Sequence, residues 1–158
     1  MKFRSLMAAG AALFLATAAG AQTVEFRGGG YLSVPHNAAC KAGGWPGREY
    51  YVNIRYRPAG LGSNPPQDRL SFFFPHFAMN YQVTGSLTKT FQPLSAGGGL
   101  GSGHYTYSTA VEIKKTSMKP RTVTVKSQSV VLSGRIKNLD DVTGCNGVFR
   151  GTLARTPG

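Results

Sequence analysis

The sequence predicts an all-β fold, either an antiparallel β-sandwich or a small β-barrel of about seven or eight strands with one disulfide. Three observations predict it. Apolar and polar side chains alternate along several segments, as in half-buried strands. Runs rich in glycine, proline and asparagine separate these segments. Two cysteines, Cys40 and Cys145, lie near the two ends of the domain.

The alternation is clearest over 49–57, where every second side chain from Tyr50 to Tyr56 is large and apolar, and over 80–92. Gly28-Gly29-Gly30 is interpreted as a turn between two short strands. A short helix stays an alternative only near residues 70–79. The other expected strands lie around Val24 and Phe26, over Tyr31–Val34, over Leu70–Pro75, over Tyr105–Ile113, over Val123–Leu132 with a bulge, and around Phe149 and Leu153.

The first residues have the three-part layout of a cleavable signal peptide. Lys2 and Arg4 precede an uncharged apolar stretch over 6–19, and Ala19-Gly20-Ala21 is a cleavage site of small residues. A membrane anchor is the alternative, but the stretch is shorter than the roughly 20 apolar residues that a span needs. We therefore expect a mature chain that starts at Gln22.

Removal of residues 1–21 leaves residues 22–158, which we expect to form a single domain. The product is expected to be a periplasmic or secreted monomer with no transmembrane segment. An even number of cysteines in an exported chain predicts one disulfide, Cys40–Cys145. Two free thiols are the alternative. No CxxC spacing points to a redox or zinc role.

The mature chain is strongly basic, with 16 lysines and arginines against six acids, a net charge of +10. Such an excess favours anionic partners: phosphorylated lipid surfaces, acidic envelope polymers or nucleic acid. The alternative is that the charge only keeps an exported protein soluble, because net charge reports on solubility and nonspecific binding.

Basic residues gather around the turn at Pro120. The group is Lys114, Lys115, Lys119, Arg121 and Lys126. If the strands on either side of this turn pair, the group lies at a hairpin tip and faces a polyanion. The alternative is a solvated tip.

A second basic group is Arg55 and Arg57, on the polar side of their strand beside Tyr51. The tyrosine would stack on a ligand while the arginines bind phosphate or carboxylate through their forked guanidinium groups. The alternative is a charged strand that discourages edge-to-edge aggregation.

Motifs for catalysis or cofactor binding are missing from the sequence. His36, His76 and His104 lack the HxH or HExxH spacing of metal ligands, and we find neither a G-x-S-x-G nucleophile nor a phosphate-binding loop. Asp140-Asp141 is interpreted as part of a turn that the aspartate side chains stabilise through local backbone hydrogen bonds. We expect no cofactor and no metal, and the missing motifs favour a protein that is not an enzyme.

Trp45 is the one tryptophan, in Gly43-Gly44-Trp45. This triplet is similar to the Gly-x-Trp of lipocalins and other small ligand-binding barrels, which implies a barrel with an apolar ligand beside Trp45. No companion motif accompanies the triplet, so it assigns no family.

Together these features predict an exported protein of a bacterial envelope, a non-enzymatic binding or structural module with affinity for anionic envelope components. One alternative is a small barrel that binds an apolar ligand in an interior cavity. The other is an envelope-polymer hydrolase, in which His36 or His104 would meet an acid and a nucleophile.

Overall fold

The computed structural model describes residues 23–62, 66–95 and 110–156. Within these residues, eight antiparallel strands form one sheet in the order β4-β3-β2-β1-β8-β7-β6-β5. The strands are β1 (Phe26–Ser33), β2 (Glu49–Arg57), β3 (Gln67–Phe73), β4 (Ala78–Thr84), β5 (Gln92–Pro93), β6 (Glu112–Lys119), β7 (Ser129–Lys137) and β8 (Gly147–Arg155). Two short helices, α1 (Ala38–Ala42) and the 3₁₀ turn η1 (Leu139–Asp141), accompany them.

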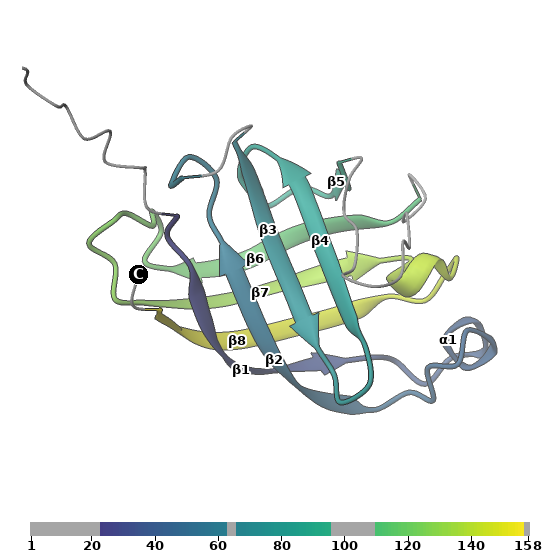
Figure 1. Ribbon diagram of the computed structural model, residues 1–158. Helices are drawn as coiled ribbons and strands as arrows, with labels where there is room; N and C mark the ends of the chain where they lie inside the picture. The colour runs from purple at the N-terminus through teal and green to yellow at the C-terminus, as the bar shows by residue number, and fades with distance from the viewer. Residues whose placement is uncertain (1–22, 63–65, 96–109, 157–158) are drawn as a thin grey trace, which may run out of the picture.

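The sheet curls into a nearly closed barrel, so the all-β prediction is confirmed in its barrel form. Figure 1 shows β3 and β4 crossing in front of β6, β7 and β8. β4 and β5 are the two ends of the strand order, and Ser95, just after β5, links them. Its backbone N–H and its hydroxyl donate to the carbonyl oxygen of Gln82 in β4, at 2.8 Å and 3.1 Å.

Apolar side chains fill the interior. Phe72 of β3 and Phe149 of β8 are separated in the sheet by two strands, yet their ring centroids lie 5.2 Å apart across the barrel. Tyr81 of β4 packs edge-on against Phe72 at 5.7 Å. The largest side chains with almost no exposed surface are Tyr81, Phe26, Phe72, Phe149, Leu32, Leu70, Met79, Ile113, Leu132, Ile136, Leu139 and Leu153.

Glycines at inward-facing positions let the strands pack closely around this core. A β-carbon placed on Gly30 or on Gly151, which are paired across β1 and β8, would lie 2.6 Å from the Cδ1 atom of Ile54. At Gly30 the backbone carbonyl oxygen of Arg150 would obstruct it as well. The narrow interior therefore requires glycine where Ile54 crosses it.

The interpretation of Gly28-Gly29-Gly30 as a turn is wrong for this reason. The three glycines lie in the middle of β1, which pairs with β2 and β8 along its whole length. The two short strands expected around this turn are therefore one strand. The glycines provide close approach between neighbours rather than a reversal of the chain.

Other boundaries differ from expectation. The strand predicted over 80–92 ends at Thr84, because Gly85 has a positive φ of 71°. The strand predicted over Val123–Leu132 begins only at Ser129. The strand predicted from Tyr105 starts at Glu112 among the described residues; positions 105–109 lie outside them. The strand over 49–57 is confirmed with the predicted bounds.

The predicted disulfide is present and ties α1 to the segment before β8. No helical pattern in the sequence predicted α1, a short helix that begins after Asn37. The Asn37 side-chain oxygen accepts a hydrogen bond from the backbone N–H of Cys40 at 2.8 Å, which caps the helix. The cap and the disulfide thus act on the same residue.

A buried carboxylate holds two loops together. Asp68 of β3 accepts hydrogen bonds from the hydroxyl of Tyr56 at 3.1 Å and from the backbone N–H groups of Ala59 and Leu87, both at 2.6 Å. Burial raises the pKa of Asp68 although these hydrogen bonds favour its ionised form. Nothing in the sequence pattern singled Asp68 out.

The close approach at Ile54 predicts a specific pattern of rescue. Gly151→Ala should lower the free energy of unfolding by about 1–3 kcal/mol, because its new methyl group meets Ile54. Ile54→Val removes the obstructing Cδ1 atom, so the double variant should lose less stability than the two single losses combined. Urea denaturation of the four proteins measures this coupling.

Gly30→Ala is the matched control. There the Arg150 carbonyl oxygen also obstructs the methyl group, and Ile54→Val does not move it. Rescue of Gly30→Ala to the same degree, or no rescue of Gly151→Ala, would contradict this account of the interior.

Candidate functional site

Four arginines gather on the outer surface of three neighbouring strands. Alternation directs Arg27 of β1, Arg55 and Arg57 of β2, and Arg69 of β3 away from the core. In the sheet register, Arg27 lies opposite Arg55, and Arg57 lies opposite Arg69. Opposed side chains on one face have β-carbons about 4.5–5.5 Å apart. We call these four residues the arginine face.

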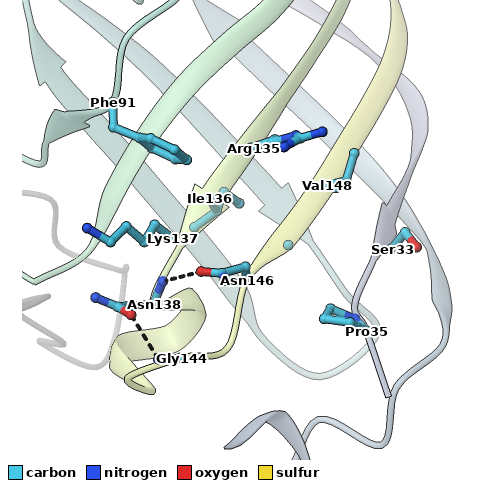
Figure 2. A pocket seen from close by; sticks show the side chains of 11 residues that line it. Ser33, Pro35, Phe91, Arg135, Ile136, Lys137, Asn138, Gly144, Asn146 and Val148 are labelled. Carbon is cyan, nitrogen blue, oxygen red and sulfur yellow. Dashed lines mark hydrogen bonds between the residues drawn. The ribbon is translucent and has the colours of Figure 1, made fainter. Parts of the chain in front are cut away.

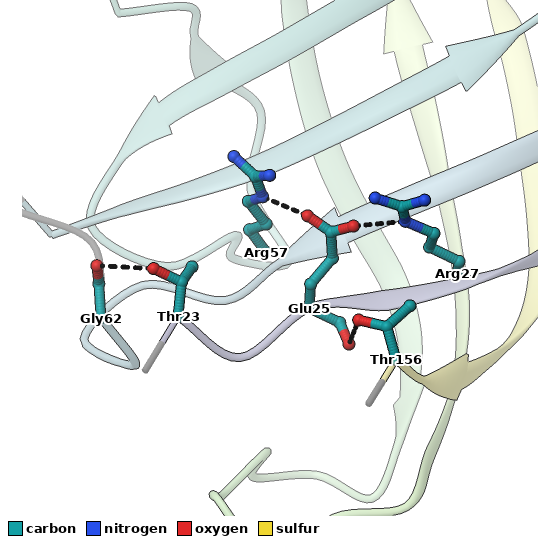
Figure 3. Close-up of polar contacts among 6 residues, drawn as sticks. All are labelled: Thr23, Glu25, Arg27, Arg57, Gly62 and Thr156. Carbon is teal, nitrogen blue, oxygen red and sulfur yellow. Dashed lines mark hydrogen bonds and ion pairs between the residues drawn. The ribbon is translucent and has the colours of Figure 1, made fainter. Parts of the chain in front are cut away.

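One carboxylate organises half of this face. The side chain of Glu25 is almost fully buried and forms ion pairs with Arg27 and Arg57, each through the Nε atom. In Figure 3 the dashed lines from the Glu25 carboxylate run to the Nε atoms of both arginines and not to their terminal nitrogens. The Glu25 backbone carbonyl accepts hydrogen bonds from the backbone N–H and hydroxyl of Thr156 at 2.9 Å and 3.1 Å. The two arginines are therefore fixed, while their terminal N–H groups donate to no acceptor in the part of the chain that the structure describes.

The ionisation of Glu25 reflects this arrangement. Burial alone would raise the pKa of its carboxyl group, but the hydrogen bonds and charges of Arg27 and Arg57 outweigh burial and hold the pKa below its ordinary value. Glu25 is therefore a carboxylate at neutral pH.

Arg55 and Arg69 lack such a partner: among the described residues, no carboxylate lies within ion-pair distance of either. The guanidinium carbon of Arg55 lies 5.3 Å from the centre of the Phe73 ring. Burial, followed by the charges of Arg57 and Arg27, lowers the pKa of Arg55. The Nε atom of Arg69 is buried and finds no hydrogen-bond acceptor within the described part of the chain. An anion bound at this face would neutralise the charge of Arg55 and would accept a hydrogen bond from the Nε–H group of Arg69.

A depression of about 530 Å³ opens between Arg27 and Arg55. Phe73 and Asn53 belong to its lining, together with Gly28 and Ile54. The depression therefore combines two cations, an aromatic ring and an amide.

Two of the four arginines were predicted from the sequence. Arg55 and Arg57 lie on the predicted outer face of their strand, but Arg27 and Arg69 were missed. Both occupy outward positions of their own strands, which is the signal that could have found them. Only the strand order brings them beside Arg55 and Arg57.

The predicted lysine group does not form one patch. Lys119, Arg121 and Lys126 are exposed around the connection from β6 to β7, as expected of a hairpin tip. Lys114 and Lys115 instead lie near the start of β6, four to five residues from its end. β6 runs from these two lysines to Lys119, so the extended strand holds them apart from the residues at the β6–β7 connection.

Lys114 belongs to a different basic surface. Its ammonium group lies 4.3 Å from the centre of the Phe91 ring, and it is opposite Arg135 in the register of β6 and β7. Figure 2 shows Phe91 and Arg135 beside a depression of about 490 Å³. Lys137, on the same wall, pairs with Glu112 at 2.6 Å.

Trp45 lies in an aromatic plug at one end of the barrel. Its ring packs edge-on against Tyr50, Phe74 and Phe77, with centroids 5.3–6.0 Å apart. The indole also hydrogen-bonds to Asp140, whose pKa is raised chiefly by burial. Only 5% of Trp45 is exposed. Trp45 also belongs to the lining of a surface depression of about 550 Å³, together with Arg48, Tyr50 and Phe77.

The histidines offer little for chemistry. His36 and His76 are exposed, and His104 lies outside the described residues. Within residues 23–62, 66–95 and 110–156, no three His, Cys, Asp or Glu side chains are grouped to hold a metal ion. The helices in these ranges are too short to cross a membrane.

Comparisons with protein-family models, with curated proteins and with solved structures found no match to this chain. The geometry of the arginine face is therefore the basis on which a function is inferred.

The lowered pKa of Glu25 predicts a defined pH dependence. A carboxyl group with a lowered folded-state pKa adds stability above its ordinary value of 4.5, and this is lost as the pH falls through the folded-state pKa. Glu25→Gln should therefore lower the free energy of unfolding at pH 7 and flatten its decline below pH 4.5. Urea denaturation across pH measures both effects.

Glu112→Gln is the control, because the Glu112–Lys137 pair is largely solvent-exposed and should contribute less than about 1 kcal/mol. Equal losses in the two variants, or an unchanged pH profile for Glu25→Gln, would show that Glu25 has no special role.

Proposed function

We propose that this chain is an exported bacterial envelope protein that binds an anionic envelope component through the arginine face and has no enzymatic role. The observation that supports this most is the charge imbalance on β1, β2 and β3: four guanidinium groups accompany one carboxylate. Like charges in such proximity repel one another unless an anion compensates them.

The residue type also supports the proposal. Guanidinium groups bind carboxylate and phosphate groups through two parallel hydrogen bonds, which a lysine ammonium does not provide. Arg27 and Arg57 bind Glu25 through Nε, and their terminal nitrogens form no hydrogen bond within the described residues. Arg55 and Arg69 have no acid to neutralise them among the described residues.

The remaining basic residues fit a supporting role. Lys119, Arg121 and Lys126 at the β6–β7 connection, and Lys114 beside Arg135, raise the positive potential around the molecule. Dispersed charges of this kind accelerate the encounter with a polyanion more than they strengthen the final complex.

The two alternatives have weaker support. An apolar ligand inside the barrel would compete with Phe72 and Phe149, which meet across the interior. A hydrolase that uses His36 would need an acid partner, and within the described residues His36 forms no ion pair.

Binding of the purified, oxidised protein to envelope polyanions tests the proposal. The variant is Arg55→Gln/Arg69→Gln, which leaves the partners of Glu25 in place. The matched control, Lys119→Gln/Lys126→Gln, removes the same charge from the β6–β7 connection. At physiological salt, the arginine variant should bind about tenfold more weakly or worse, because charged hydrogen bonds are lost. The lysine variant should change affinity by less than about threefold.

Titrations at low and physiological salt with polygalacturonate and with phosphatidylglycerol vesicles measure both variants. Equal weakening in the two variants, or binding that disappears at physiological salt, would show that the charge acts generically and would refute the site.

A further inference from the structure

Two exposed tyrosines lie beside the arginine face. Tyr31 of β1 and Tyr51 of β2 are direct partners in the register, and their rings meet edge-on with centroids 5.7 Å apart. They are 49% and 66% exposed. Large aromatic side chains with this much open surface, next to unpaired cations, are typical of recognition sites rather than of a core.

Gly29 allows Tyr51 to lie along the sheet. A β-carbon on Gly29 would lie 3.1 Å from the Cζ atom of Tyr51 and nearer still to its hydroxyl oxygen. Gly29 is the outward position of β1 between Arg27 and Tyr31. The Tyr51 ring therefore covers β1 at Gly29, the residue that follows Gly28 of the depression lining.

We propose, building on the function above, that the anionic component is a linear acidic polysaccharide with carboxylated sugar rings. The carboxylate of one sugar lies against the guanidinium groups of Arg27 and Arg55, whose forks match its planar shape. The apolar C–H face of the ring lies on the exposed face of Tyr51. Asn53, in the depression, offers an amide to the sugar hydroxyls.

The surface continues beyond this subsite, which indicates a polymer rather than a single sugar. Tyr31 lies four residues along β1 from Arg27, a distance of about 13 Å in a strand. Opposite Tyr31 on β8 is Arg150, a further exposed cation. Two rings and a cation, Tyr51, Tyr31 and Arg150, therefore follow one another across β2, β1 and β8.

The other anionic partners match these features less well. A lipid bilayer presents a broad surface of headgroups, whereas the depression receives one protruding group between two arginines. A polyphosphate offers charge and no ring for Tyr51. A single-stranded nucleic acid offers both, but it is not a component of the envelope to which the export signal expected over residues 1–21 would direct the chain.

Substitution of Tyr51 separates ring recognition from charge recognition. Tyr51→Ala should weaken binding of polygalacturonate about fivefold or more, and should leave binding of inorganic polyphosphate within about twofold of the original, since its charge is untouched. Tyr51→Phe keeps the ring and should retain most of the affinity. Isothermal titration at physiological salt measures all three, and thermal denaturation checks that the exposed substitutions leave the fold intact.

Gly29→Ala provides an independent test, because its methyl group displaces the Tyr51 ring without removing it. It should weaken polygalacturonate binding as Tyr51→Ala does and again spare polyphosphate.

The outcomes separate the two proposals. Unchanged polygalacturonate binding by Tyr51→Ala, with binding still lost in Arg55→Gln/Arg69→Gln, would overturn the polysaccharide and leave the anion site standing. Tighter and equally Tyr51-dependent binding of oligothymidylate, or tighter binding of phosphatidylglycerol vesicles, would also overturn the polysaccharide. No effect of the arginine variant on any probe would overturn both.

Discussion

The narrow interior of the barrel is the constraint on which the rest of the structure depends. Ile54 crosses the space beside Gly30 and Gly151, and neither position has room for a side chain. Close packing there keeps β1 between β2 and β8, in the middle of the strand order. The same strand directs Arg27 and Gly29 outward. The inner packing of β1 therefore fixes the place of the outer surface to which we assign binding.

Glu25 connects this framework to the arginine face. A buried carboxylate needs compensation, and Arg27 and Arg57 provide it from two strands. In return their guanidinium groups are held in place before any ligand arrives, so less side-chain entropy is lost on binding. Repulsion among four arginines is reduced but not removed. A fixed cluster with residual positive charge is well suited to selecting an anion of defined shape.

The sequence was informative where a pattern is local. Alternation over 49–57 gave β2 with its bounds, and the cysteine count gave the disulfide. The run Gly28–Gly30 was misread, since glycine marks a turn and a close approach alike and only the neighbouring strands distinguish them. Arg27 and Arg69 were missed because residues a dozen or more positions apart become neighbours only through strand order. The reverse error grouped Lys114 with Lys119, which lie apart along one extended strand.

The disulfide changes the connectivity of the most distant strand pair. β1 and β8 are neighbours in the sheet, yet they come from opposite ends of the domain, beyond the 105 positions that separate Cys40 from Cys145. Once the bond has formed, the covalent path between the two strands passes only through the short segments that join each cysteine to its strand. The pair then resembles a hairpin with a sulfur bridge in its turn. Its effective contact order falls sharply, and the entropy of closing a long loop no longer opposes this pairing during folding.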